Sequence, residues 1–245
     1  MEVNYILYVS LAIFAASLSQ AVTGFGFALV AAPLLTFIMG PKETVMFLLF
    51  SGLFMKAVMV YKTRHQGHSR EVLVLFLGSL LGALPGSYIL RIADSGTIKM
   101  VIGIILLLAT AVLVADFRFR IVRHRLAQSV FGFLSGFCGA TTGLNGPPVV
   151  CYYLNEELPK EAMRANLVRF FILGNTGTLL LSYYWGTFQP GSIIELTLYT
   201  LPAMFLGWTA GERLFYKINA AFFNRIVVVT VFVSSVITIA SGFMS

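Results

Sequence analysis

The sequence predicts an all-α integral membrane protein built from two inverted-topology repeats. Hydrophobic residues make up 58% of the 245 residues and charged residues only 11%. The mean hydropathy is +0.87, which is more apolar character than a soluble domain of this size needs. Two apolar runs contain similar glycine-rich breaks, and motifs of the first half recur in the same order in the second half. Each repeat is expected to hold one re-entrant or broken helix pair and three full transmembrane helices.

The first repeat, residues 1–116, begins with an apolar run from Tyr5 to Met39. As one helix this run would be about 52 Å long, which exceeds a bilayer core of about 30 Å. A break at Thr23–Gly26 divides it into pieces at about 5–22 and 26–39, and the second piece is too short to span alone. Full spans are expected at about 44–62, 71–91 and 97–115.

A basic loop at 117–125 leads into the second repeat, residues 126–245. Its apolar run, 126–154, is broken at Gly143–Pro148, and a polar connection follows. This run either re-enters the membrane or crosses it twice, and two half-length pieces favour re-entry. Full spans are expected at about 163–185, 192–212 and 221–242.

The two halves share short motifs in the same order. Gly82 and Gly86 recur 125 positions later as Gly207 and Gly211. We interpret the pattern as a tandem duplication, with an accidental match of glycine-rich helices as the alternative. The other matched segments are Thr23-Gly24 with Thr142-Gly143 and Pro41-Lys42-Glu43 with Pro159-Lys160-Glu161.

Loop charge predicts the topology. The basic loops at 62–70 and 117–125 are separated by two spans and therefore lie on the same side, which the positive-inside rule assigns to the cytoplasm. Three full crossings per half is an odd number, so the halves insert in opposite directions and both termini are extracytoplasmic. The net charge of +7 then reflects cytoplasmic loops and not a nucleic-acid partner.

The two breaks are the candidate binding site. Asn145 is a suitable N-cap and Pro147 suits the first turn of a new helix, so a short helix should begin there with unpaired N–H groups that favour an anion. A kink that only serves packing is the alternative. Paired breaks in inverted repeats point to a midplane anion site. The predicted substrate-binding residues are Thr23, Gly24, Phe25, Gly26, Thr142, Gly143, Leu144, Asn145, Gly146, Arg169 and Asn175.

Two cations lie within predicted spans, where charge is costly. Lys56 and Arg169 either reach back to the membrane interface or form a cytoplasmic vestibule that attracts anions; Lys56 is assigned to the vestibule. Cys138 and Cys151 are expected to be small buried hydrophobes, and neither a metal site nor a cofactor is expected. The full spans hold no midplane carboxylate, so the carrier of any coupled proton stays unassigned.

The chain resembles the TauE/SafE-type sulfite exporters, also called the TSUP family, over essentially its whole length. The resemblance rests on Thr23-Gly24-Phe25-Gly26 with Pro33, on the motif from Thr142 to Pro148, and on the Pro-Lys-Glu turn after each break. It implies a multi-pass transporter in the bacterial inner membrane. The implied substrates are small sulfur-containing anions such as sulfite, sulfonates, sulfoacetate or thiosulfate. The chain has Leu144-Asn145 where the family pattern is richer in glycine.

The sequence leaves three functions to compare. The first is a secondary transporter, by implication an exporter, that works by alternating access. The second is an anion channel, or a transporter of a different small organic anion, with the same site. An integral membrane enzyme is disfavoured because no zinc-binding or serine-nucleophile motif falls within a span. The expected partners are a small anion, membrane lipid and coupled protons; the identity of the anion, the transport direction and the oligomeric state stay open.

Overall fold

Every regular element in the described part of the chain is a helix. The computed structural model describes residues 3–63, 69–115, 123–156 and 158–215, together with isolated positions between 229 and 240. The predicted span at 221–242 therefore lies almost entirely outside the described residues. In order, the helices are α1 (Val3–Thr23), α2 (Phe27–Thr36), α3 (Pro41–Lys62), α4 (Ser69–Ile92), α5 (Ser95–Ala115), α6 (His124–Thr142), α7 (Gly146–Leu154), α8 (Lys160–Tyr184) and α9 (Pro190–Phe215).

Four helices in the described residues are long and apolar enough to cross a membrane. These spans are Asn4–Val22, Pro41–Tyr61, Glu71–Ile92 and Pro190–Leu214, in α1, α3, α4 and α9. Large apolar side chains such as Leu81, Leu108 and Leu206 are exposed on the outside of the helices, as a lipid-facing surface requires. The expected all-α integral membrane fold is confirmed.

Both predicted breaks are present, and both have the same backbone geometry. Gly24 follows α1 with φ +85°, and Gly143 follows α6 with φ +77°. This left-handed conformation ends a helix and strongly favours glycine, because a Cβ would be strained there. The N–H of Gly24 donates to the carbonyl of Gln20 (2.8 Å), and the N–H of Gly143 donates to that of Gly139 (2.9 Å). The two breaks therefore share the same left-handed glycine and the same backbone hydrogen bond at an offset of 119 residues.

The helix pairs around the breaks are unequal in length. α6 has 19 residues, which is about 28 Å of helix, whereas α7 has only 9. The expectation of two half-length pieces was therefore wrong: the break comes only after α6 has covered most of a membrane thickness. The side chain of His124, at the start of α6, lies 2.9 Å from that of Glu156, just after α7. The chain thus returns to the end from which it set out, as expected for a re-entrant pair.

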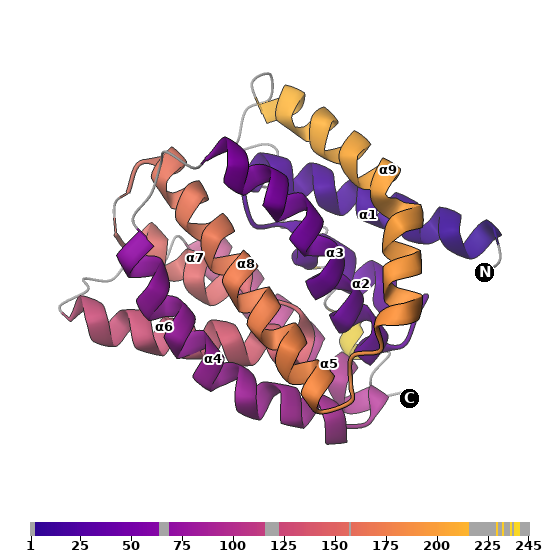
Figure 1. Ribbon diagram of the computed structural model, residues 1–245, viewed down its shortest axis with the longest axis horizontal. Coiled ribbons are helices and arrows are strands. Elements are labelled where there is room, and N and C mark those ends of the chain that lie inside the picture. Colours follow the sequence, from indigo (N-terminus) through magenta and orange to yellow (C-terminus); the bar gives the residue numbers. More distant parts are fainter. Residues whose placement is uncertain are drawn as a thin grey trace.

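Helices from different halves of the chain pack most closely together. α4 packs on α6, α1 packs on α9, and α3 and α8 run between these two pairs (Figure 1). Glycines let the backbones touch: a Cβ on Gly82 of α4 would lie 1.9 Å from the Phe133 carbonyl oxygen of α6, and one on Gly207 of α9 would lie 2.3 Å from that of Phe14 of α1. The same contact therefore occurs twice, at positions that the proposed duplication would make equivalent.

Candidate functional site

The two breaks meet in the interior of the molecule. A Cβ on Gly146, the first residue of α7, would lie 3.7 Å from the carbonyl oxygen of Phe25, just before α2. A small cavity opens between the two helix starts. Six of its lining residues belong to the predicted binding set, namely Phe25, Gly143, Leu144, Asn145, Gly146 and Asn175. Lys56, which the sequence assigned to the vestibule, also lines the cavity, and the remaining seven were not predicted, namely Gln20, Phe27, Ala28, Leu29, Leu48, Pro147 and Phe171.

Gln20 holds the first break together. Its side-chain amide donates to the carbonyl of Gly24 at 2.7 Å and accepts from the N–H of Phe27 at 3.0 Å. The amide therefore joins the end of α1 to the start of α2, and it satisfies two backbone groups that the break leaves without helical partners. Sequence reasoning missed Gln20. The available signal was a lone amide side chain in an otherwise apolar run, four residues before Gly24.

Asn145 holds the second break in a different way. It occupies the N-cap position of α7, as predicted, but it makes no capping hydrogen bond. Its amide instead donates to the side-chain oxygen of Asn175 on α8 at 2.7 Å, and Asn175 donates to the carbonyl of Leu49 on α3 at 3.0 Å. The carbonyl of Asn145 also accepts from the Ser135 hydroxyl. The capping expectation is thus corrected: the side chain links α7 to the long helices.

At two equivalent positions, the two breaks carry an amide residue and a glycine in opposite order. Gly139, the counterpart of Gln20 at the 119-residue offset, has no side chain, and a Cβ there would lie 2.7 Å from the Cβ of Asn145. Asn145 is in turn the counterpart of Gly26. Each break therefore has one amide and one glycine at these two positions, in opposite order. The swap places both amides in the lining of one cavity.

Lys56 lines this cavity. Its side chain is only 6% exposed, and its Nζ lies 5.0 Å from the centroid of the Phe171 ring. It forms no salt bridge with any carboxylate in the described residues. The ammonium group also lies against Gly52, where a Cβ would be 3.0 Å away. The structure therefore places Lys56 at the helix breaks, whereas the sequence had suggested a cytoplasmic vestibule.

Several predicted residues lie beside the cavity and do not line it. The Thr142 hydroxyl donates to the carbonyl of Cys138 at 2.7 Å and accepts from the N–H of Leu144 at 3.3 Å, so it stabilises the turn. A Cβ on Gly24 would meet the side chain of Arg164, at 3.7 Å. Gly26 and Arg169, which is half-buried, are also absent from the lining. The side chain of Thr23 lies outside the described part of the structure.

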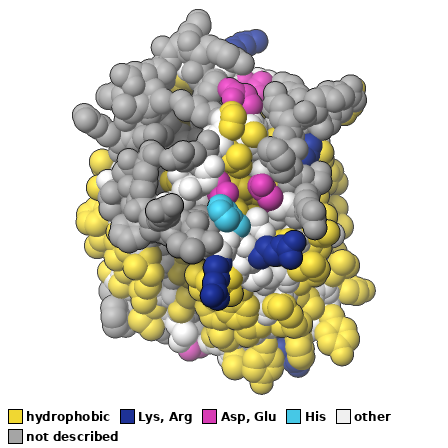
Figure 2. Space-filling model, turned by 90° about the vertical axis from the view of Figure 1, so that its left-hand side faces the viewer, with side chains coloured by type: hydrophobic (Ala, Val, Ile, Leu, Met, Phe, Trp, Pro, Cys, Tyr) yellow, Lys and Arg dark blue, Asp and Glu magenta, His cyan; other side chains and the backbone are white. Residues whose placement is uncertain are grey.

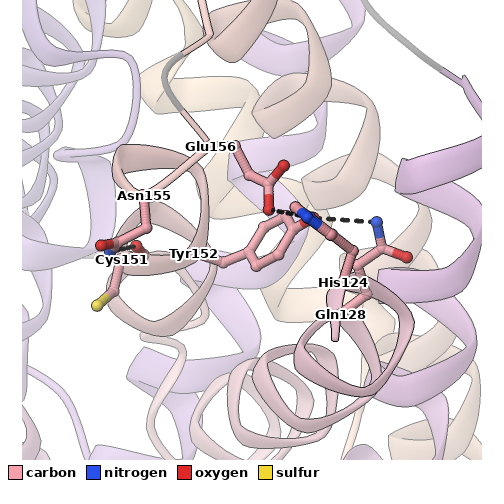
Figure 3. A network of polar contacts seen from close by, with 6 residues as sticks. All are labelled: His124, Gln128, Cys151, Tyr152, Asn155 and Glu156. Atoms are coloured by element: carbon pink, nitrogen blue, oxygen red, sulfur yellow. Dashed lines mark hydrogen bonds and ion pairs between the residues drawn. The ribbon is translucent and has the colours of Figure 1, made fainter. Parts of the chain in front are cut away.

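A second polar network fastens the end of α7 to the start of α6 (Figure 3). Gln128 donates to the hydroxyl of Tyr152 at 3.0 Å, close to the ion pair of His124 with Glu156, and Asn155 donates to the carbonyl of Cys151 at 2.8 Å. On the face seen in Figure 2, acidic, basic and histidine side chains lie close together, with apolar side chains around them. This network secures the end of the α6–α7 pair that lies away from the cavity.

The cavity offers polar groups but little room. About 10 Å³ is open to the centre of a water molecule, which suffices for about one water. A ligand with several heavy atoms does not fit into this cavity without movement of the lining residues.

A family model described as "Sulfite exporter TauE/SafE" matches residues 9–238 of the chain. The match spans both breaks and the Pro-Lys-Glu turn after each. No curated protein and no solved structure matches the chain.

Proposed function

The chain belongs to the TauE/SafE sulfite exporter family of membrane transporters, and from this membership we propose that it exports small sulfur-containing anions across the bacterial inner membrane. Sulfite, sulfonates, sulfoacetate and thiosulfate are the proposed substrates. The anion binds in the cavity between the two breaks and crosses by alternating access. The inverted repeat, with both termini extracytoplasmic and halves at 1–116 and 126–245, is part of this proposal.

The observation that carries the proposal is the head-to-head start of α2 and α7 at one cavity. Arg91, at the end of α4, shows that α8 ends on the same side of the molecule on which α3 begins. Its guanidinium stacks on Trp185, just after α8, at 5.6 Å. Its carbonyl accepts a hydrogen bond from the side chain of Lys42, at the start of α3. α2 leads to the start of α3, and α7 leads to the start of α8. The two short helices therefore point in opposite directions, with their positive ends facing each other across the cavity.

The two helix starts supply donors unequally. In α2, the N–H groups of Ala28 and Leu29 belong to the first turn, which has no intrahelical acceptors, and both residues line the cavity. In α7, Pro147 and Pro148 have no N–H at all. The side-chain amides of Asn145 and Asn175 lie on that side of the cavity, and each amide nitrogen carries two hydrogens. An anion would thus meet mainly backbone donors from one repeat and amide donors from the other.

The predicted residues that do not line the cavity also have roles in the proposed function. Thr23, Gly24, Gly26 and Thr142 shape the turns that aim the helix starts, and Arg169 draws anions toward the site from the cytoplasm. Because a ligand with several heavy atoms does not fit into the cavity otherwise, transport requires the lining to open. Movement of one repeat against the other would open it first to one side and then to the other.

Gly146→Ala tests the site without disturbing the fold. Its Cβ would meet only ordinary contacts, the nearest at 3.7 Å, yet it would occupy the cavity. We expect at least about tenfold weaker binding, which corresponds to about 1.4 kcal/mol, in thermal-shift titrations with sulfite, thiosulfate, sulfoacetate and sulfate. Gly191→Ala, where a Cβ meets nothing within 4 Å, is the matched control. Equal affinities in a folded Gly146→Ala protein would place the site elsewhere.

An anion channel is the alternative function for the same cavity. Counterflow in preloaded liposomes separates the two, because unlabelled anion inside stimulates the uptake of labelled anion through a carrier, whereas a simple pore shows no trans-stimulated exchange. The proposed duplication and the paired breaks favour alternating access by a carrier. Trans-stimulated uptake supports the transporter, and uptake that is indifferent to the internal anion supports the channel.

A further inference from the structure

We propose that Lys56 carries a proton together with the transported anion. The inference rests on the proposed function, since it takes the cavity between the breaks as the anion site. It adds the coupling: Lys56 is protonated when the anion is bound and gives up its proton when the cavity is empty. The anion and one proton then cross the membrane in the same direction.

The position of Lys56 makes it the one group able to do this among the residues that line the cavity. The lining comes from α1, α2, α3, α8 and the segment around the start of α7, and Lys56 is its only titratable side chain in the described residues. A second cation, Arg164, lies beside Gly24 and pairs with Glu212 at 3.4 Å. Neither member of that pair lines the cavity.

Among the described residues, no carboxylate forms a salt bridge with the Nζ of Lys56. The ring of Phe171 lies on one side at 5.0 Å, and near Gly52 the neighbouring groups are a ring carbon of Phe27 and the side-chain nitrogen of Asn175, which is a donor. A buried ammonium with only a ring face as partner loses most of its hydration without a full replacement. An anion in the cavity would provide that replacement, so the charged form of Lys56 and the bound anion stabilise each other.

The proton balance follows directly. On the side where the anion enters, the neutral amine of Lys56 takes one proton from water and forms an ammonium that pairs with the anion. On the other side the anion leaves, and the ammonium returns the proton to water. A singly charged anion is then carried without net charge, and a doubly charged anion with one net negative charge.

Proteoliposomes with a pH-sensitive dye inside test the coupling. The probes are methanesulfonate, sulfoacetate and thiosulfate, whose charges stay fixed near neutral pH, so any proton movement belongs to the protein. For the wild-type protein we expect one proton to move with each anion, and a pH gradient to drive anion flux. Lys56→Gln should lose both binding and flux by more than about tenfold. Lys42→Gln, on the same helix but outside the cavity, is the control and should keep both.

Lys56→Arg separates coupling from mere binding. Arginine stays protonated throughout, so this variant should exchange anion for anion yet lose net flux and its response to pH. A structural lysine would not split the two activities. Anion flux without proton movement in the wild type, or coupled flux in folded Lys56→Gln, would overturn the inference and leave the proposed function intact. A wild-type protein that neither binds nor moves any of the probes would instead overturn the proposed function.

Discussion

Single amides decide how each break is held. Gln20 reaches across its break and bonds both sides of it, whereas Asn145 turns away from its own helix start toward Asn175. The first amide stabilises a turn within one repeat, and the second ties three helices together. The two breaks therefore share a backbone and differ in what their side chains do.

Gln20→Leu should destabilise the protein by about 1–3 kcal/mol, because it leaves a buried carbonyl and a buried N–H unpaired. Thermal unfolding in detergent measures the loss. Ser129→Ala is a suitable control, since the Ser129 hydroxyl bonds to a carbonyl one turn earlier on an exposed face of α6. An unchanged unfolding temperature for Gln20→Leu would mean that water replaces the amide at the break.

Lys56→Met should raise stability in anion-free detergent by about 1–3 kcal/mol, because a buried amine without a hydrogen-bond partner in the described residues is replaced by an apolar chain of similar length. The same change should abolish stabilisation by added anion. Lys42→Met, at the partly exposed start of α3, should have little effect on either measurement. A destabilised Lys56→Met protein would show that the lysine supports the fold.

Gly139→Ala should also destabilise, because the new Cβ would lie 2.7 Å from the Cβ of Asn145. The double variant Gly139→Ala/Asn145→Gly removes the clash but also the hydrogen bond of Asn145 to Asn175, so its loss should be smaller than the sum of the two single losses. A double-mutant cycle of unfolding free energies then gives a coupling of about 0.5–3 kcal/mol. Additive losses would mean that Gly139 matters for another reason.

Sequence reasoning found those site residues whose type is out of place in a membrane span. Glycine, asparagine and proline interrupt an apolar run, so Gly143, Asn145 and Gly146 were visible. Gln20 was missed because one amide inside a helix gives no sign of which backbone groups it reaches. The depth of Lys56 was missed for a similar reason, because a lysine near a helix end and one buried against Phe171 look alike in sequence.

At the scale of elements, the glycine contacts are the feature most open to test. In the α4–α6 contact a Cβ on Gly136 would lie 1.9 Å from the carbonyl oxygen of Ser79, and Gly82 is equally tight. Small residues allow membrane helices to approach this closely. The α1–α9 contact uses Gly207 and Gly211 in the same way.

Gly82→Ala and Gly207→Ala should each destabilise by at least about 1–3 kcal/mol, because the added methyl group meets backbone that cannot move aside. Gly191→Ala, at the open start of α9, should cause no loss. Denaturation in detergent compares the three. Similar losses at Gly82 and Gly207 support the duplication, and a loss at only one of them contradicts the equivalence of the two contacts.

Helix positions could be predicted because apolar length and glycine breaks are local properties. Both breaks and the described spans lie within a few residues of the prediction. The unequal pairs could not be predicted in this way, because hydropathy does not tell how deep a helix ends. α8, with 25 residues, is long enough to cross the membrane. It is more polar than the four helices that are long and apolar enough to do so. Several of its polar side chains, those of Asn166, Asn175 and Thr178, are buried in the protein interior.

For the whole molecule, contacts sort the helix ends into two groups. Lys42, Arg91 and Trp185 meet at one end. At the other, Arg164 pairs with Glu212 and His124 with Glu156. This sorting agrees with the loop-charge prediction, in which the second group is cytoplasmic.

Thiol labelling can test the topology. In a background without Cys138 and Cys151, we expect Asp94→Cys to react with a membrane-impermeant reagent in intact cells. Glu161→Cys should react only after the membrane is opened. A periplasm-specific reporter fused after Ser245 should give signal. Labelling of both cysteines from the same side, or a cytoplasmic Ser245, would refute the inverted arrangement.

The contact between α1 and α9 has a consequence for synthesis. Pro190, where α9 begins, comes 167 residues after Thr23, where α1 ends. A ribosome that adds about 5–20 residues per second needs roughly 10–30 s to reach it. During that interval the face of α1 that packs on Gly207 and Gly211 is not covered by α9. Lipid or the insertion machinery covers this face until α9 is made. α1 is therefore made long before the helix that covers this face, and a nascent chain cut short before α9 leaves the face uncovered by its protein partner.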